Sequence, residues 1–147
     1  MTALVVLILM WALLAAAWVG LDALLARRSG WSALAARYRG RPSSVAAPLR
    51  NAIVRMGQGT TASVVYNRSL VVAVGDDGIG LRAVPPFGVA SRPLLIPWDA
   101  LEPRPIGDRG GAPAFKVTVR DPRVTIVFER DAARRVRDAW RARAAGH

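Results

Sequence analysis

The sequence contains no cysteine, a single histidine and a single lysine. Without cysteine, these 147 residues can form no disulfide, thiolate metal site or cysteine nucleophile. The one histidine, His147, leaves no histidine triad and no multi-histidine metal site. A phosphate loop of the GxxxxGK[ST] type is also missing. We therefore expect no cofactor, no metal and no enzymatic activity. An enzyme that uses Asp, Glu, Ser, Tyr or Lys in an unrecognised site is the alternative.

Charge is scarce and uneven. Charged residues make up 21% of the chain and hydrophobic residues 52%, and the mean hydropathy is +0.25. The net charge of +11 divides into −1 for residues 1–26, +7 for 27–55, +1 for 56–129 and +4 for 130–147. The central region is therefore nearly neutral. The basic excess lies beside the apolar N-terminal segment and near the C-terminal end.

Residues 2–21 carry no charge, and ten of them are Leu, Ile or Val. Twenty helical residues cover about 30 Å, which is the hydrocarbon thickness of a bilayer. This run predicts a transmembrane anchor helix over residues 1–26, with Asp22 at its water-accessible edge. A signal peptide cleaved near Ala15–Ala17 is an alternative, but the run is long and no basic residue precedes it. A buried core helix is the second alternative, and it would need an apolar partner helix.

The arginines that follow this segment set its orientation. Five of them lie within about 20 residues of its C-terminal end, at positions 27, 28, 37, 39 and 41. Basic residues near a span favour the cytoplasmic side. We therefore expect the N-terminus outside and the remainder of the chain in the cytoplasm.

Small residues recur along one face of the anchor helix. Ala12, Ala16 and Gly20 have four-residue spacing, which lets two membrane helices approach closely. A homodimer through this face is one interpretation. The other is that an alanine-rich helix produces such spacing by chance.

Residues 27–49 are expected to form a basic juxtamembrane helix and a linker. Trp31, Leu34, Ala35 and Tyr38 fall on one face of a short helix, and Gly40 with Pro42 would end it. Trp and Tyr beside arginine suit a helix at the lipid headgroups. Packing of Trp31 and Tyr38 onto the cytoplasmic domain is the alternative.

Residues 50–147 are expected to form one mainly-β domain, a small barrel or sandwich of about seven antiparallel strands capped by an amphipathic helix. Turns are expected at Asn67-Arg68, at Asp76–Gly78 and at 85–88, with a longer loop at 103–113. The expected strands are Ala52–Met56, Ala62–Tyr66, Leu70–Val74, Gly80–Val84, Pro93–Trp98, Phe115–Arg120 and Val124–Phe128.

Three residues have expected structural roles in this domain. Pro97 lacks an amide proton and predicts an edge strand or a bulge. Trp98 fills the end of the barrel or, alternatively, lines a groove beside that edge. Asp131 is the expected N-cap of the final helix, whose Val136 and Trp140 must bury against the barrel.

Seven strands followed by one amphipathic helix with a buried Trp resemble the pleckstrin-homology-like superfold, which includes the GRAM-type domains. Residues 30–140 are also similar to a set of uncharacterised bacterial single-pass membrane proteins. That resemblance implies an inner-membrane location and no established activity. It rests on Gly30, Trp31, Leu34, Ala35, Tyr38, Tyr66, Asn67, Gly78, Leu81, Pro93, Ile96, Pro97 and Trp98.

These expectations together describe a membrane-anchored, non-enzymatic binding or adaptor protein. Its expected partners are anionic lipid headgroups and an unidentified protein, and no nucleic acid is expected. An accessory structural subunit of a larger membrane complex is the alternative. The residues expected to contact the membrane surface or a partner are Arg27, Arg28, Trp31, Arg37, Tyr38, Arg39, Arg41, Arg134, Arg135, Arg137 and Arg141.

Overall fold

A computed structural model describes residues 1–42, 47–85, 88, 91–107 and 110–146. Parts of the expected linker in 27–49, of the 85–88 turn and of the 103–113 loop lie outside these residues. The elements are α1 (Thr2–Arg28), α2 (Trp31–Arg37), β1 (Leu49–Gln58), β2 (Val64–Val74), β3 (Gly78–Ala83), β4 (Leu94–Pro97), the 3-10 turn η1 (Trp98–Ala100), β5 (Leu101–Pro105), β6 (Ala114–Val119), β7 (Val124–Glu129) and α3 (Arg130–Ala145).

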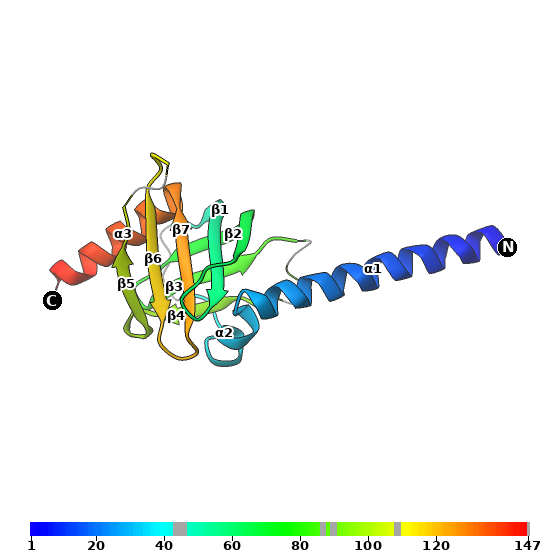
Figure 1. Cartoon of the computed structure of the whole chain (residues 1–147), viewed down its shortest axis with the longest axis horizontal. Helices are drawn as coiled ribbons and strands as arrows, with labels where there is room; N and C mark the ends of the chain where they lie inside the picture. The colour runs from blue at the N-terminus through cyan, green and yellow to red at the C-terminus, as the bar shows by residue number, and fades with distance from the viewer. Residues whose placement is uncertain (43–46, 86–87, 89–90, 108–109, 147) are drawn as a thin grey trace.

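The seven strands form one antiparallel sheet in the order β4-β3-β2-β1-β7-β6-β5, which curls into a nearly closed barrel (Figure 1). The edge strands β4 and β5 are joined by the short turn η1. Residues 38–40 pair with the outer side of β4, because Leu95 donates to the Tyr38 carbonyl at 3.0 Å and Gly40 donates to the Pro93 carbonyl at 3.3 Å. Pro97 lies on an edge strand, as expected.

Two strand assignments differ from the sequence-based expectation, although the strand number agrees. The expected strands at 62–66 and 70–74 form the single strand β2, and Asn67-Arg68 is an irregularity within it rather than a turn. Arg68 has a φ of 57° there, and the β1–β2 register shifts near Ala52. Such irregularities bend a strand without ending it, as a barrel requires.

The second difference is β5, which was not expected and overlaps the start of the expected 103–113 loop. Its two prolines disfavour a central strand but are compatible with an edge strand. The turn at Asp76–Gly78 is confirmed, with the Gly75 amide donating to the Gly78 carbonyl at 3.0 Å.

The barrel interior is filled by alternate Val, Ile, Leu and Phe side chains, including Val54, Leu81, Ile126 and Phe128. α3 begins at Arg130 with Glu129 as its N-cap residue, so the expected capping by Asp131 is wrong. Asp131 instead lies in the first turn, where a carboxylate favours the helix dipole.

α3 covers one end of the barrel, as expected. Val136 is fully buried, and Trp140 packs against Trp98 with ring centroids 6.1 Å apart. Trp98 is itself buried and donates its indole N–H to the Gly75 carbonyl at 3.0 Å. Core packing is therefore the interpretation of Trp98 that the structure supports.

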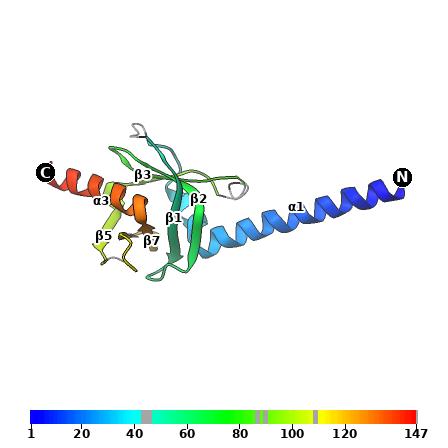
Figure 2. The same ribbon diagram turned by 90° about the horizontal axis from the view of Figure 1, so that it is seen from above.

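α1 projects from the barrel as a single long rod, and the C-terminal end of α3 points away from it (Figures 1 and 2). The two basic regions of the chain are therefore attached to different sides of the barrel.

Candidate membrane-facing site

The exposed part of α1 ends where the apolar run ends. Every residue from 1 to 21 is exposed, and none of the most apolar 18-residue window is buried. The helix is long and apolar enough to cross a membrane. A helix in the core of a soluble protein would be mostly buried, so the core-helix alternative does not fit this geometry.

Burial begins abruptly at Asp22, which is 3% exposed. The expectation that water reaches Asp22 is therefore wrong. Asp22, Ala26 and Ser29 face the barrel, whereas Leu24 on the other side of the helix stays 48% exposed. The last two turns of α1 thus lie against the barrel on one side only.

Ser29 and Tyr66 form a buried polar contact at this junction, 2.9 Å apart. The Ser29 hydroxyl also lies 3.3 Å from the Ala26 carbonyl and accepts from the Trp31 amide at 3.3 Å. Burial raises the pKa of Tyr66 above its ordinary value of 10.0, and the charge of Asp22 adds to the rise, while the contact with Ser29 opposes it. Tyr66 is therefore a neutral donor and acceptor at neutral pH.

Trp31 is the largest fully buried side chain at the junction, with 0% exposure. Its indole N–H donates to the Arg92 carbonyl at 2.9 Å, and its ring lies 5.9 Å from that of Tyr66. Of the two interpretations of Trp31, packing on the domain is the one observed. Trp31 therefore belongs to the core and cannot be a membrane-surface residue in this conformation.

Gly30 permits the sharp reversal between α1 and α2. Its φ is 83°, and a Cβ placed there would lie 2.7 Å from the Val124 side chain. Glycine alone combines this backbone conformation with so close an approach. The chain can therefore turn back tightly enough to insert Trp31 and Leu34 into the core.

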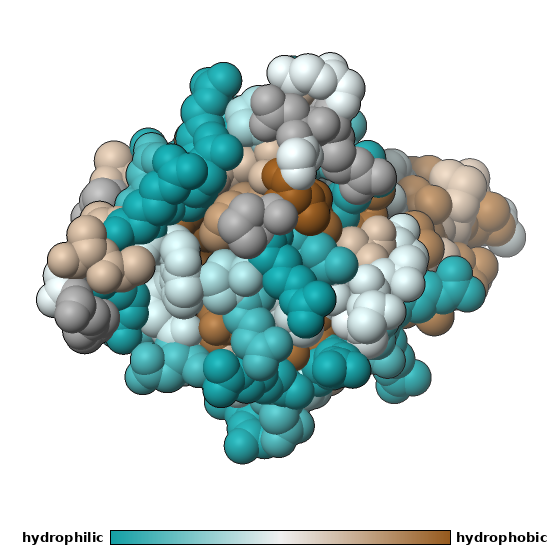
Figure 3. Space-filling view, turned by 60° about the vertical axis from the view of Figure 1, so that its left-hand side comes forward, coloured by the Kyte–Doolittle hydropathy of each residue, from teal (hydrophilic) through white to brown (hydrophobic). Residues whose placement is uncertain are grey.

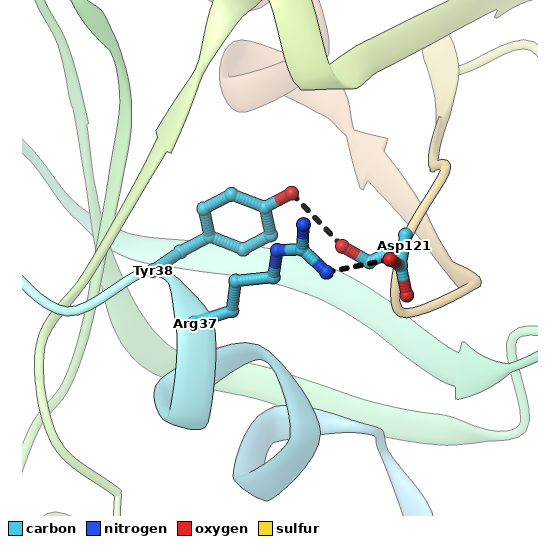
Figure 4. Close-up of polar contacts among 3 residues, drawn as sticks. All are labelled: Arg37, Tyr38 and Asp121. Atoms are coloured by element: carbon cyan, nitrogen blue, oxygen red, sulfur yellow. Dashed lines mark hydrogen bonds and ion pairs between the residues drawn. The ribbon is translucent and has the colours of Figure 1, made fainter.

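Arg37 and Tyr38 point toward the β6–β7 turn (Figure 4). The Arg37 guanidinium lies 2.5 Å from the Asp121 carboxylate, and the Tyr38 hydroxyl donates to the Asp121 carbonyl at 2.9 Å. The ion pair is exposed, at 58% and 75% for the two side chains, so its own contribution is small. Both residues, which are expected membrane-surface or partner contacts, link α2 to the barrel, and their contact with a membrane or a partner stays a prediction.

Four expected contact residues remain exposed, two at the end of α1 and two in the segment that follows α2. Arg27 and Arg28 end α1, where a positive charge favours the helix dipole. Arg39 donates to the Ala35 carbonyl at 2.8 Å, and Arg41 lies at a groove of about 340 Å³ on the outer face of β2 and β3. Among the residues that the structure describes, none of these four guanidinium groups pairs with an acid.

The arginines of α3 do not join this set. α3 extends away from α1 in both ribbon views, and hydrophilic side chains dominate the face of the molecule opposite α1 (Figure 3). Arg134 pairs with Asp131 at 3.2 Å, and the Arg135 guanidinium donates to the Ala47 carbonyl. Arg137 is partly buried and Arg141 is exposed. The arginines of α3 therefore lie on a different part of the molecule from Arg27 and Arg28, and their contact with a membrane surface or a partner stays a prediction.

Sequence reasoning missed the barrel side of the junction. Ser29, Tyr66 and Asp121 make the contacts that fix α1 and α2, yet none was expected to do so. Tyr66 is one of the residues that carry the resemblance to bacterial single-pass proteins, but that resemblance gave it no role. Ser29 and Asp121 had no sequence signal beyond lying next to Gly30 and in an expected turn region. In the described ranges, no group of three or more His, Asp or Glu residues is arranged to hold a metal ion.

Ala12, Ala16 and Gly20 are exposed on α1, and nothing lies within 4 Å of the Cβ position of Gly20. The homodimer interpretation of this face therefore stays a prediction. In comparisons with known proteins, no family model, no curated protein and no solved structure matches the chain.

Proposed function

We propose that this is a single-pass protein of a bacterial inner membrane whose pleckstrin-homology-like barrel is a non-enzymatic binding module at the cytoplasmic surface. The observation that carries the proposal is the joint between α1 and the barrel. Twenty-one exposed residues precede Asp22, and burial in the barrel follows directly. This arrangement is typical of a domain that is rigidly attached to its anchor helix, because a flexible tether would leave several polar residues between the helix and the domain.

The geometry of the joint also indicates which arginines would lie at the bilayer surface. The barrel meets α1 from Asp22 onward, so a membrane that covers residues 2–21 places Arg27 and Arg28 at the headgroup level. Each arginine near an anionic leaflet contributes about 1 kcal/mol. Arg39 and Arg41 lie in the next segment and are also exposed. These four arginines are the proposed lipid contacts, and those of α3 are left for a partner or for solvent.

Topology can be tested by single-cysteine labelling, because the chain has no cysteine of its own. We expect a membrane-impermeant maleimide to label Thr2→Cys in intact cells and to label Ser32→Cys and Ala144→Cys only after permeabilisation. Leu9→Cys, inside the span, should resist labelling in both conditions. Labelling of Ala144→Cys in intact cells would reverse the orientation, and a mature chain that lacks residue 2 would establish cleavage.

The lipid contact can be tested through stability, since a ligand of the native state raises its melting temperature. We expect the full chain to melt higher in phosphatidylglycerol vesicles than in phosphatidylcholine vesicles. Replacing arginines 27, 28, 39 and 41 by Gln should remove that difference. Replacing arginines 104, 120, 134 and 141, which are exposed and do not line the groove of Arg41, should retain it. Equal loss in both variants would contradict a specific surface.

A further inference from the structure

Three residues other than glycine have a positive φ in the described part of the chain: Asn51 at 55°, Arg68 at 57° and Arg130 at 56°. They belong to β1, β2 and α3, yet all three line one depression. A side chain disfavours this left-handed conformation, although Asn tolerates it better than Arg does. Strained backbone of this kind collects at ligand sites. Because left-handed residues from three different elements meet at this depression, the depression is a candidate ligand site.

The depression is also positively charged. Arg50, Arg68 and Arg130 line it, and in the described ranges none of their guanidinium groups has an ion pair or a hydrogen bond. Two carboxylates lie at the same place, but both are already paired. Glu129 contacts Arg55 at 2.9 Å, and Asp131 contacts Arg134 at 3.2 Å. Three cationic groups without an ion pair of their own thus share the depression with two carboxylates that are paired to other arginines, and the lining keeps a formal charge of +1 (three arginines less two acids).

The volume of the depression and the hydrogen-bond donors that line it indicate which class of ligand it can bind. Its volume is about 180 Å³. At about 30 Å³ per water molecule, this equals roughly six waters, which is room for a phosphate group. Guanidinium groups match phosphate oxygens through paired N–H donors, and the Asn51 amide adds a further donor. A single carboxylate would leave part of this donor set unused.

We propose that Arg50, Arg68 and Arg130 form a phosphate-binding pocket where β1, β2 and α3 meet. The left-handed backbone at Asn51, Arg68 and Arg130 gathers these residues around the phosphate, and the register shift at the start of β1 creates the space for it. The pocket is separate from the arginines at the root of α1. It therefore does not depend on the proposed membrane orientation.

The first test titrates inorganic phosphate into the full chain in dodecyl maltoside at constant ionic strength, with calorimetric detection. We expect saturable binding with a Kd below about 1 mM. The variant R50Q/R68G/R130G should bind at least about tenfold more weakly. Glycine at 68 and 130 suits the positive φ, so these changes remove charge without adding backbone strain. The matched control R82Q/R104Q/R123Q loses the same charge elsewhere on the barrel and should bind within about twofold of wild type.

Absence of saturable binding by the wild type, or equal weakening in both triple variants, would overturn the proposal. The single variant R50Q leaves both left-handed arginines in place and repeats the test if the triple variant does not fold. It should weaken phosphate binding severalfold. An R50Q affinity equal to that of wild type, with the triple variant unfolded, would also overturn it.

A second arm identifies where the phosphate comes from. The same titration is made in nanodiscs of phosphatidylcholine alone and with phosphatidylglycerol. If a lipid headgroup fills the pocket, inorganic phosphate should bind several-fold more weakly in the nanodiscs than in detergent. If the ligand is a soluble phosphate, its affinity should be the same in all three. Both results support the pocket, and each selects one source.

Discussion

Replacing Trp31 by Ala tests whether the segment that joins α1 to the barrel is part of the barrel core. Trp31 is 0% exposed, and its indole donates to the Arg92 carbonyl. Truncation of a buried Trp costs about 3–5 kcal/mol, and the carbonyl left without its donor adds about 1 kcal/mol or more. We therefore expect a loss of about 4 kcal/mol or more. A headgroup-level Trp would instead cost about 0.5 kcal/mol or less.

The assay is thermal unfolding of the full chain in dodecyl maltoside, followed by far-UV circular dichroism in the β-sheet region. For a domain of about 120 residues, 1 kcal/mol corresponds to roughly 3–5 °C. Trp31→Ala should therefore lower the Tm by roughly 12–20 °C. Trp31→Phe keeps the six-membered ring but loses the indole hydrogen bond and part of the buried ring volume, so an intermediate fall of roughly 5–12 °C is expected.

Trp11→Ala is the matched control, because Trp11 is 61% exposed on the same helix. It should leave the Tm within about 3 °C of wild type. If Trp31→Ala behaved like Trp11→Ala, the shared core between α1, α2 and the barrel would be refuted. The proposed rigid attachment of the barrel to α1 would then be refuted as well.

The remaining predictions concern the junction and the two ends of the barrel. Because the folded state holds the Tyr66 proton more tightly than the unfolded state does, the stability of the fold should decrease as pH rises above about 10. In thermal melts between about pH 9 and 11, Tyr66→Phe should make that decrease less steep. An unchanged slope would contradict the burial of Tyr66 as the cause. Gly78→Ala should lower the Tm by more than about 5 °C, because the added Cβ would lie 2.1 Å from the Ile96 carbonyl oxygen. Gly59→Ala is the control: its Cβ would meet no atom within 4 Å, so it should lower the Tm by less, despite its φ of 75°. Trp140→Ala should lower the Tm by roughly 3–10 °C by uncovering Trp98, measured by the same melts, and a loss below about 1 °C would show that α3 does not cover this end.

Local patterns were sufficient for much of the fold. The uncharged run predicted α1, and the alternation of Phe115, Val117 and Val119 with polar residues predicted the strand that became β6. Prolines and an Asn-Arg pair were misleading in β5 and β2, because an edge strand tolerates proline and a barrel strand tolerates an irregularity. Both tolerances depend on the neighbouring strands, which no local window contains.

The candidate site was less accessible to sequence reasoning. Arginine spacing identified basic segments, but the direction of each side chain depends on residues distant in the chain. Arg37 reaches Asp121 across 84 positions, and Ser29 meets Tyr66 across 37. The proposed phosphate pocket likewise combines Arg50, Arg68 and Arg130, and the left-handed backbone of the two arginines at 68 and 130 has no sequence signature. Only the barrel closure brings these groups together.

The sheet edges restrict how a partner could bind the barrel. The outer side of β4 already pairs with residues 38–40, so its backbone groups are partly used. β5 contains Pro103, which has no amide proton to offer an added strand. Strand addition therefore has little to engage on either edge. A partner would therefore have to recognise side chains rather than add a strand. The two basic surfaces, one at the root of α1 and one where β1, β2 and α3 meet, lie on different parts of the barrel. In the proposed function, the arginines at the root of α1 contact the membrane, and the depression around Arg50, Arg68 and Arg130 is left to bind a phosphate-bearing ligand.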